Sequence, residues 1–172
     1  VGWHSERPTC QSQLTLLASS PYKFGVESSA STAFAAAPSG TGLVFPLFAP
    51  DGELDFGALA DVGQASVTNY GTAAAPVTFT ISGPTPEAGF VITDTTSGDR
   101  IEFLGQVPAG SVLVINSANG SVVIDGTADR LGDTLVDAWP AVPAGETRTF
   151  LFEPNGSTTA SILTVETVAT YW

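Results

Sequence analysis

The chain has 172 residues, of which 43% are apolar and 13% are charged, so it suits one domain whose core needs no disulfide. Seventeen acidic residues against five basic ones give a net charge of −12, which repels nucleic-acid phosphates and anionic lipid. We therefore expect no nucleic-acid partner. No apolar run approaches the roughly 20 residues of a membrane span, and no secretory signal pattern occurs, so no membrane insertion is expected.

Few side chains carry reactive chemistry. Cys10 is the single cysteine, which excludes an internal disulfide and a cysteine-based metal site. His4 is the single histidine and lies near the N-terminus, so we expect no Ser-His-Asp or Cys-His pair and no enzyme. No catalytic, cofactor-binding or metal-binding residue is assigned, and no cofactor is expected. Because the chain has no methionine, we expect Val1 not to be the primary start and the chain to be a fragment of a larger protein.

The first third of the chain gives few clear strand patterns. Residues 13–18 (QLTLLA) predict a first strand, and residues 21–25 (PYKFG) end it. Residues 27–42 are mostly small and lack helical periodicity, which predicts a loop. Residues 43–48 (LVFPLF) are apolar with Pro46 inside, which predicts a sheet edge or a bulge.

From residue 64 onward the pattern is typical of β-structure. Residues 64–71 and 75–83 predict two strands, and in the second Val77, Phe79 and Ile81 share one face. The opposite face carries threonine and serine, which indicates a half-buried antiparallel strand.

Hairpins follow along the rest of the chain. Residues 89–105 turn through 96–99, and residues 111–126 turn at an Asn-Gly pair. Pro-Ala-Gly precedes two strands, at 108–110 and 143–145, and predicts similar turns. Residues 160–172 predict the closing strand. About ten short strands with no convincing helix predict an all-β fold, a sandwich or a barrel.

Two acidic segments are candidates for calcium sites. Asp125, Asp129, Asp133 and Asp137 are spaced by four, but the glycines among them argue against a helix. They favour a polar connection between strands, with a calcium loop as the alternative. Residues 50–57 (PDGELDFG) resemble a calcium loop weakly and favour an acidic turn, because the full spacing and the distal glutamate are missing.

Two further patterns carry little functional information. The triplet Asn-Gly-Ser begins at Asn119 and at Asn155 and matches a glycosylation acceptor, but Asn-Gly is also what a tight turn requires, and we favour the turn. Paired carboxylates could serve a glycosidase, yet among 17 acidic residues some pair is always close.

Aromatic rings could form a platform for a sugar. Most aromatic residues in a small β domain are core, and we expect this of the phenylalanines at alternating strand positions. The candidates for an exposed platform are Trp3, Trp139, Trp172, Tyr22, Tyr70 and Tyr171.

A resemblance to a known family begins at residues 66–84 (SVTNYGTAAAPVTFTISGP). A strand ending in Asn-x-Gly-Thr, a proline, and an alternating strand closing on Gly-Pro are similar to the C-terminal half of distal tail proteins of long-tailed phages, often called minor tail proteins. The family's hairpin and Ala-Gly turn follow in order over residues 91–126, and its connection with an aromatic-Pro turn resembles residues 128–152, including Trp139 and Pro140. Residues 165–172 resemble its terminal strand.

Upstream, residues 14–25 resemble the hinge between the family's N-terminal ring domain and its C-terminal domain. The usual pattern there is Asp-Pro-Arg-x-Tyr/Phe-Gly, from which Ser20-Pro21-Tyr22-Lys23-Phe24-Gly25 departs at two positions. Residues 40–48 resemble the Gly-rich lead into a Phe-Pro strand. The resemblance covers about Leu14 to Trp172.

The resemblance implies a galectin-like antiparallel β-sandwich over residues 25–172, with residues 1–24 as a residual arm of the ring domain. It implies a virion protein at the distal end of the tail that attaches tail-tip or receptor-binding components, with a hexameric ring expected only in the full-length protein. We look for partner contacts first at residues 27–42 and 126–137. The alternative functions are a carbohydrate-binding module for host envelope glycans and a calcium-stabilised adhesin.

Overall fold

The computed structural model describes residues 21–34, 63–157 and 160–172. Within these residues the chain forms twelve strands and one 3-10 turn of three residues, η1 (Leu131–Asp133). The strands expected at 13–18 and 43–48 and the acidic turn at 50–57 lie outside the described residues.

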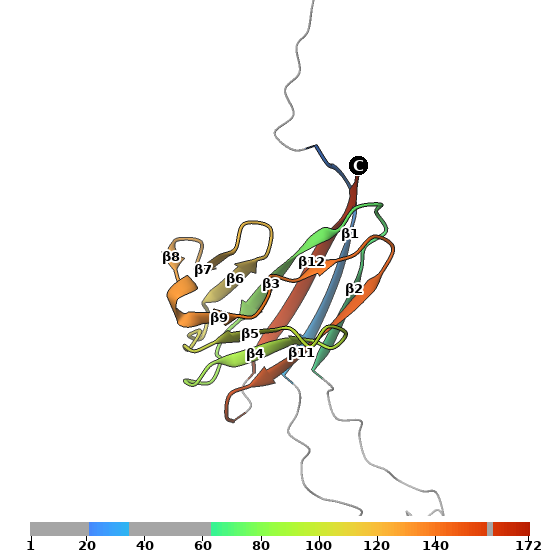
Figure 1. The fold of residues 1–172 in the computed structure, drawn as a ribbon. Coiled ribbons are helices and arrows are strands. Elements are labelled where there is room, and N and C mark those ends of the chain that lie inside the picture. Colours follow the sequence, from blue (N-terminus) through green and yellow to red (C-terminus); the bar gives the residue numbers. More distant parts are fainter. Residues whose placement is uncertain (1–20, 35–62, 158–159) are drawn as a thin grey trace, which may run out of the picture.

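Two antiparallel sheets stack face to face as a sandwich (Figure 1). The larger sheet has the order β1 (Lys23–Ala33), β12 (Ile162–Tyr171), β3 (Ala75–Ser82), β6 (Val112–Asn116), β7 (Ser121–Ile124) and β8 (Ala128–Asp129), and β10 (Ala141–Val142) also pairs with β3. The smaller sheet has the order β2 (Gln64–Thr68), β11 (Thr147–Pro154), β4 (Phe90–Asp94), β5 (Arg100–Phe103) and β9 (Thr134–Val136). The all-β sandwich prediction is therefore confirmed.

The core lies between the sheets and follows the alternation of the sequence. In β3, Val77, Phe79 and Ile81 are fully buried, while the intervening threonines face outward and are half-buried. The rings of Phe79 and Phe150 join the two sheets edge to face, with centroids 5.0 Å apart. The expectation that strand phenylalanines form the core is confirmed for Phe79, Phe90, Phe103, Phe150 and Phe152.

The first described strand corrects the prediction of a loop over residues 27–42. Residues 27–33 belong to β1, which pairs with β12 along its length, with one register shift between Phe24 and Glu27. The serines and alanines of β1 have low strand propensity and show no apolar alternation, so no local pattern indicates a strand here. Pairing with the apolar β12 outweighs that propensity. Residues 35–42 lie outside the described part of the chain.

Strand β1 begins beside the end of β12. Lys23 pairs with Tyr171, so both lie at one end of the sandwich (Figure 1). β1 runs through the boundary expected between residues 24 and 25. The division into an arm over 1–24 and a sandwich over 25–172 stays a prediction, because residues 1–20 are outside the described range.

The two Pro-Ala-Gly segments form the same turn, as predicted. The Ser111 amide donates to the Pro108 carbonyl at 3.1 Å, and the Glu146 amide donates to the Pro143 carbonyl at 3.2 Å. Gly110 and Gly145, at the third position of each turn, have φ of 82° and 71°. A positive φ at this position is what a type II turn requires, which explains the glycine.

The Asn-x-Gly segment after β2 holds this end of the fold together. Asn69 is fully buried, and its Nδ2 donates to the carbonyls of Ala73 at 2.7 Å and Val142 at 2.9 Å. Its Oδ1 accepts from the Gly71 amide at 2.8 Å. A Cβ at Gly71 would overlap the backbone of Thr170. The asparagine and the glycine of this motif are therefore structural, and Asn69 fixes the position of β10.

Candidate binding groove

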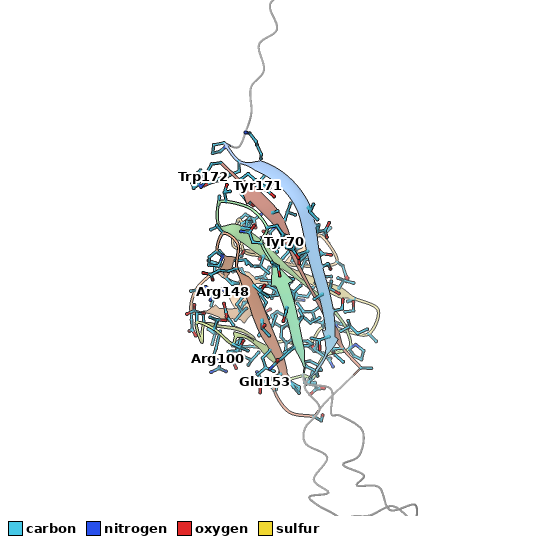
Figure 2. All side chains as sticks on the ribbon, turned by 90° about the vertical axis from the view of Figure 1, so that its right-hand side faces the viewer. Tyr70, Arg100, Arg148, Glu153, Tyr171 and Trp172 are labelled. Atoms are coloured by element: carbon cyan, nitrogen blue, oxygen red, sulfur yellow. The ribbon has the colours of Figure 1, made fainter. Side chains whose placement is uncertain are left out.

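Exposed aromatic residues gather at the end of the sandwich where β1 begins and β12 ends. Figure 2 shows Tyr70, Tyr171 and Trp172 at this end. Trp172 is 70% exposed, and its ring lies 5.0 Å from that of Tyr22, tilted by 52°. The Tyr171 hydroxyl donates to the Tyr70 carbonyl at 3.2 Å. Four of the six candidate aromatic residues thus share one end of the molecule.

A groove of about 450 Å³ lies on the outer side of the larger sheet at the same end. Trp139 and Tyr22, both 37% exposed, line it together with Phe24, which is 62% exposed. The rest of the lining is Ala74, Pro76, Ser117, Ala118, Pro140, Ala141 and Thr170. The groove is therefore an open apolar surface with three aromatic rings.

The groove exists because β6 is shorter than its neighbour β3. β6 ends at Asn116, and the chain turns there, with the Ser117 amide donating to the Val77 carbonyl at 3.0 Å. Beyond this turn β10 takes over as the partner of β3, pairing Ala141 with Pro76. Trp139 and Pro140 directly precede β10 and lie beside this turn.

Trp139 rests on the tip of the β6–β7 hairpin. A Cβ added to Gly120 would lie 3.3 Å from each of three neighbouring indole atoms, Cε2, Cζ2 and Nε1. Equal distances to three adjacent ring atoms mean that the Gly120 backbone packs against a face of the indole. Gly120 also has φ of 66°, a conformation that glycine adopts without strain. The predicted Asn119-Gly120 turn is thus confirmed, and its glycine packs against the indole of Trp139.

A second lobe of about 350 Å³ continues the groove and shares Phe24, Pro76, Ala118 and Thr170 with the first. Its lining includes Asn116, Thr78 and Glu166, together with Thr167 and Thr170, whose side chains are buried. Asn116 pairs with Thr78, and Thr78 pairs with Glu166, on three adjacent strands. The three side chains therefore form a row across the outer face of the sheet, with neighbouring strands about 4.8 Å apart.

Among the other candidate aromatic residues, Trp3 lies outside the described residues. Tyr70 is 64% exposed but does not line the groove. Phe24 was missed as a candidate because it lies in a segment predicted to end a strand. The spacing of Tyr22, just before β1, and Phe24, within β1, was the signal that both face the same side of the extended chain.

The aspartates at 125–137 do not converge. Asp125 Oδ1 accepts from the Val112 amide at 2.9 Å, and Asp129 Oδ1 accepts from the Leu131 amide at 2.9 Å. Asp133 pairs with Arg130 at 3.3 Å. Within residues 21–34, 63–157 and 160–172, no three histidine, cysteine or acidic residues group as metal ligands. The segment also differs from a plain connection, because β8, η1 and β9 form within it.

We expect chelation to leave the fold unchanged. Since the carboxylates of Asp125, Asp129 and Asp133 are each used in local contacts, adding EDTA should shift the melting temperature by less than about 1 °C. The measurement is a thermal melt with EDTA and again after adding excess Ca²⁺. A loss of several degrees on chelation, restored by calcium, would contradict this.

Asn155 lies just beyond β11, and its Nδ2 donates to the Ala88 carbonyl and to Glu102 Oε1, both at 3.1 Å. Its amide hydrogens are therefore engaged in holding neighbouring segments. His4 and Cys10 both lie outside the described residues. No helix in the described part of the chain is both long and apolar enough to cross a membrane.

A largely buried charged pair joins the neighbouring strands β4 and β11. Arg148 Nη1 lies 3.7 Å from Asp94 Oδ2, and the two side chains are 16% and 7% exposed. Asp94 also accepts from the Thr96 amide at 2.8 Å, and Arg148 Nη2 bonds Glu146 at 3.1 Å. Arg148 Nε is buried without a hydrogen-bond partner in the described structure. These contacts give Asp94 and Arg148 a structural role.

Removing the cation alone should cost stability. Arg148→Met leaves Asp94 buried without its ion pair, and we expect a loss of about 2–3 kcal/mol in the free energy of unfolding. The double variant Arg148→Met/Asp94→Asn should regain part of this loss, because the uncompensated charge is gone. Urea unfolding of both variants and of Asp94→Asn gives the free energies of unfolding for a double-mutant cycle. A loss in the double variant equal to the sum of the losses in the two single variants would argue against a coupled pair.

The described fold is a two-sheet antiparallel β-sandwich that carries its candidate site on a sheet face. The sequence model of the siphovirus-type tail component family, C-terminal domain, matches residues 70–166, which is more than half of the chain. The chain therefore belongs to this family and is a component of the phage tail. The resemblance to distal tail proteins, and the expected location in the virion at the distal part of the tail, are confirmed.

A solved structure shows the same fold. The crystal structure of Dit (gp 19.1) of phage SPP1, described as a paradigm of the hub adsorption apparatus in phages that infect Gram-positive bacteria, aligns with 90% of this chain at a TM-score of 0.59 and 11% identity. The chain spans half the length of that structure. No protein with a curated description matches the sequence.

Proposed function

We propose that this chain is a non-catalytic domain that projects from the tail-tip hub and attaches other tail-tip or receptor-binding components. The observation that carries the proposal is the match to the siphovirus-type tail component family over residues 70–166. Membership in this family implies contacts with other tail components. The finer role, attachment through a projecting surface, rests on the geometry of the sandwich.

Two features of the sandwich suit a projecting attachment domain. The strands are hydrogen-bonded in continuous ladders, and β1 and β2 meet where the two sheets join, with the Thr68 amide donating to Ser28 Oγ at 3.0 Å. The body is therefore rigid. The aromatic groove with Trp139 and Phe24 gives it an exposed apolar surface of the kind that marks interaction sites.

The proposal makes a prediction about assembly. If a separate N-terminal domain builds the hexameric ring of the full-length protein, this chain alone should be a monomer of 17.6 kDa by light scattering behind a sizing column. A stable trimer or hexamer would mean that the sandwich itself holds the assembly. Immunogold labelling of virions with an antibody against this chain should mark the distal end of the tail, and label along the tail tube would contradict the proposed position.

A second candidate function is favoured by the groove. A carbohydrate-binding module needs an exposed aromatic platform beside polar groups in a shallow groove. Trp139 lines such a groove, and Asn116, Thr78 and Glu166 form a polar row in its second lobe. The sandwich fold itself gives no support to sugar binding, since fold does not determine function.

A further inference from the structure

We propose that the groove stacks a pyranose ring on Trp139 and selects sugars by charge, binding uncharged and amino sugars in preference to uronic acids and other anionic glycans. The inference rests on the carbohydrate-binding candidate and goes beyond it by naming the ligand class and the residue that sets it. The whole site is made of described residues on β1, β3, β6, β10 and β12 and the segments that flank them.

The first element is the platform. Gly120 packs against the Trp139 indole, so the ring is held in place from one side by backbone that has no side chain. Trp139 is nevertheless 37% exposed and lines the groove. A ring fixed on one side and open on the other loses little conformational freedom on binding, which favours stacking with a flat ligand. The C–H face of a pyranose meets this requirement, and it carries no charge of its own.

The second element is the row of polar side chains beside the platform. Asn116 Oδ1 accepts from the Ala118 amide at 2.9 Å, which leaves the Nδ2 hydrogens as donors. Thr78 supplies a hydroxyl, and Glu166 supplies a carboxylate. Within the described residues the Glu166 carboxylate has no hydrogen-bond or ion-pair partner, although its side chain is half-buried. Donors and acceptors on neighbouring strands suit the hydroxyl groups of a sugar, which both donate and accept hydrogen bonds.

The third element is the charge of the site. Glu166 is the one ionisable residue that lines the second lobe, and apart from Tyr22 the lining of the first lobe has none. Lys23 lies between the groove residues Tyr22 and Phe24 in the sequence but does not line either lobe. An anionic sugar would therefore bring its carboxylate to Glu166 without a cation to offset the repulsion. An amino sugar would form an ion pair at the same position.

The surface around the groove adds to this preference. Glu27 pairs with Val168, which lines the second lobe, so a second carboxylate lies on the neighbouring strand. The whole chain carries a net charge of −12, which lowers the local concentration of anionic glycans. We expect amino sugars to bind about tenfold more tightly than the matching uronic acids at low salt, with the difference shrinking as salt rises.

The test is a glycan array with glucose, galactose and mannose, each as the neutral hexose, the amino sugar and the uronic acid, read at about pH 6, where amines are protonated and carboxylates are ionised. The expected result is signal from neutral and amino forms and little from uronic acids. Glu166→Gln should remove the charge preference and leave neutral sugars unchanged. Glu153→Gln, on β11 at the far end of the molecule (Figure 2), is the matched control and should keep the preference.

Variants at the platform distinguish sugar binding itself from the selection of sugars by charge. Trp139→Ala should lose signal from all sugars, whereas Tyr70→Ala, an exposed aromatic residue outside the groove, should not. A thermal melt shows whether each variant is folded. If no sugar binds the folded wild-type chain, the carbohydrate-binding function is rejected, and the groove is then a candidate surface for a protein partner. If sugars bind through Trp139 but uronic acids bind as well as amino sugars, or Glu166→Gln changes nothing, only the charge selection is overturned.

Discussion

Asn69→Ala is expected to be among the most destabilising single substitutions in this chain, with a loss of about 3–5 kcal/mol in the free energy of unfolding. The side chain is fully buried and satisfies the carbonyls of Ala73 and Val142 as well as the Gly71 amide. Alanine leaves these backbone groups buried without those partners, because the site is closed to solvent. Each orphaned group costs about 1–3 kcal/mol.

Urea unfolding followed by circular dichroism measures this loss. Asn116→Ala is the matched control, because Asn116 is half-buried and accepts from a single backbone amide, that of Ala118. It should cost about 1 kcal/mol or less. A loss for Asn69→Ala no larger than that of Asn116→Ala would show that the network does not hold this end of the sandwich together. Asn69→Asp should be no milder than alanine, since it would place a carboxylate against two carbonyls.

Phe152→Ala should have an effect of similar size for a different reason. Phe152 has no exposed surface, stacks on Phe34 with ring centroids 4.0 Å apart, and meets Phe90 edge to face at 5.3 Å. Removing the ring leaves a cavity between the sheets and ends both contacts. We expect a loss of about 3–5 kcal/mol.

The same substitution at an exposed phenylalanine provides the control. Phe24 is 62% exposed, so Phe24→Ala should change stability by less than about 1 kcal/mol. Chemical denaturation of both variants gives the comparison. If Phe152→Ala were as mild as Phe24→Ala, the space between the sheets at Phe34 and Phe90 would have to collapse around the missing ring.

Strand identity followed from the sequence for the longer strands that bury one apolar face. In β3 the apolar residues alternate with threonines and are the buried ones, and in β11 the two inward phenylalanines, Phe150 and Phe152, are buried. β1 gave no such signal, because its inward side chains are serine, alanine and threonine and its pairing depends on β12, whose paired residues lie 129 (Ala33 to Ile162) to 148 (Lys23 to Tyr171) positions further along the chain. Local patterns do not contain that information.

The candidate site was predictable only in its parts. Trp139 and Tyr22 were recognisable as aromatic candidates, and Asn119-Gly120 as a turn. Nothing in the sequence indicated that Gly120 would pack against Trp139, which lies 19 residues later. The polar row of Asn116, Thr78 and Glu166 depends on the registers of three strands. Register is set by packing across the whole sheet, so it could not be derived from one strand at a time.

The pairing of Lys23 with Tyr171 has a mechanical consequence. In an antiparallel ladder the hydrogen bonds run perpendicular to the strands. A force that pulls Lys23 and Tyr171 apart therefore loads the β1–β12 ladder one bond at a time, as in unzipping. A force that pulls Lys23 against Ile162, at the far end of β12, loads many bonds together in shear. The sandwich should thus resist tension along its length far better than peeling at the end that carries the aromatic residues.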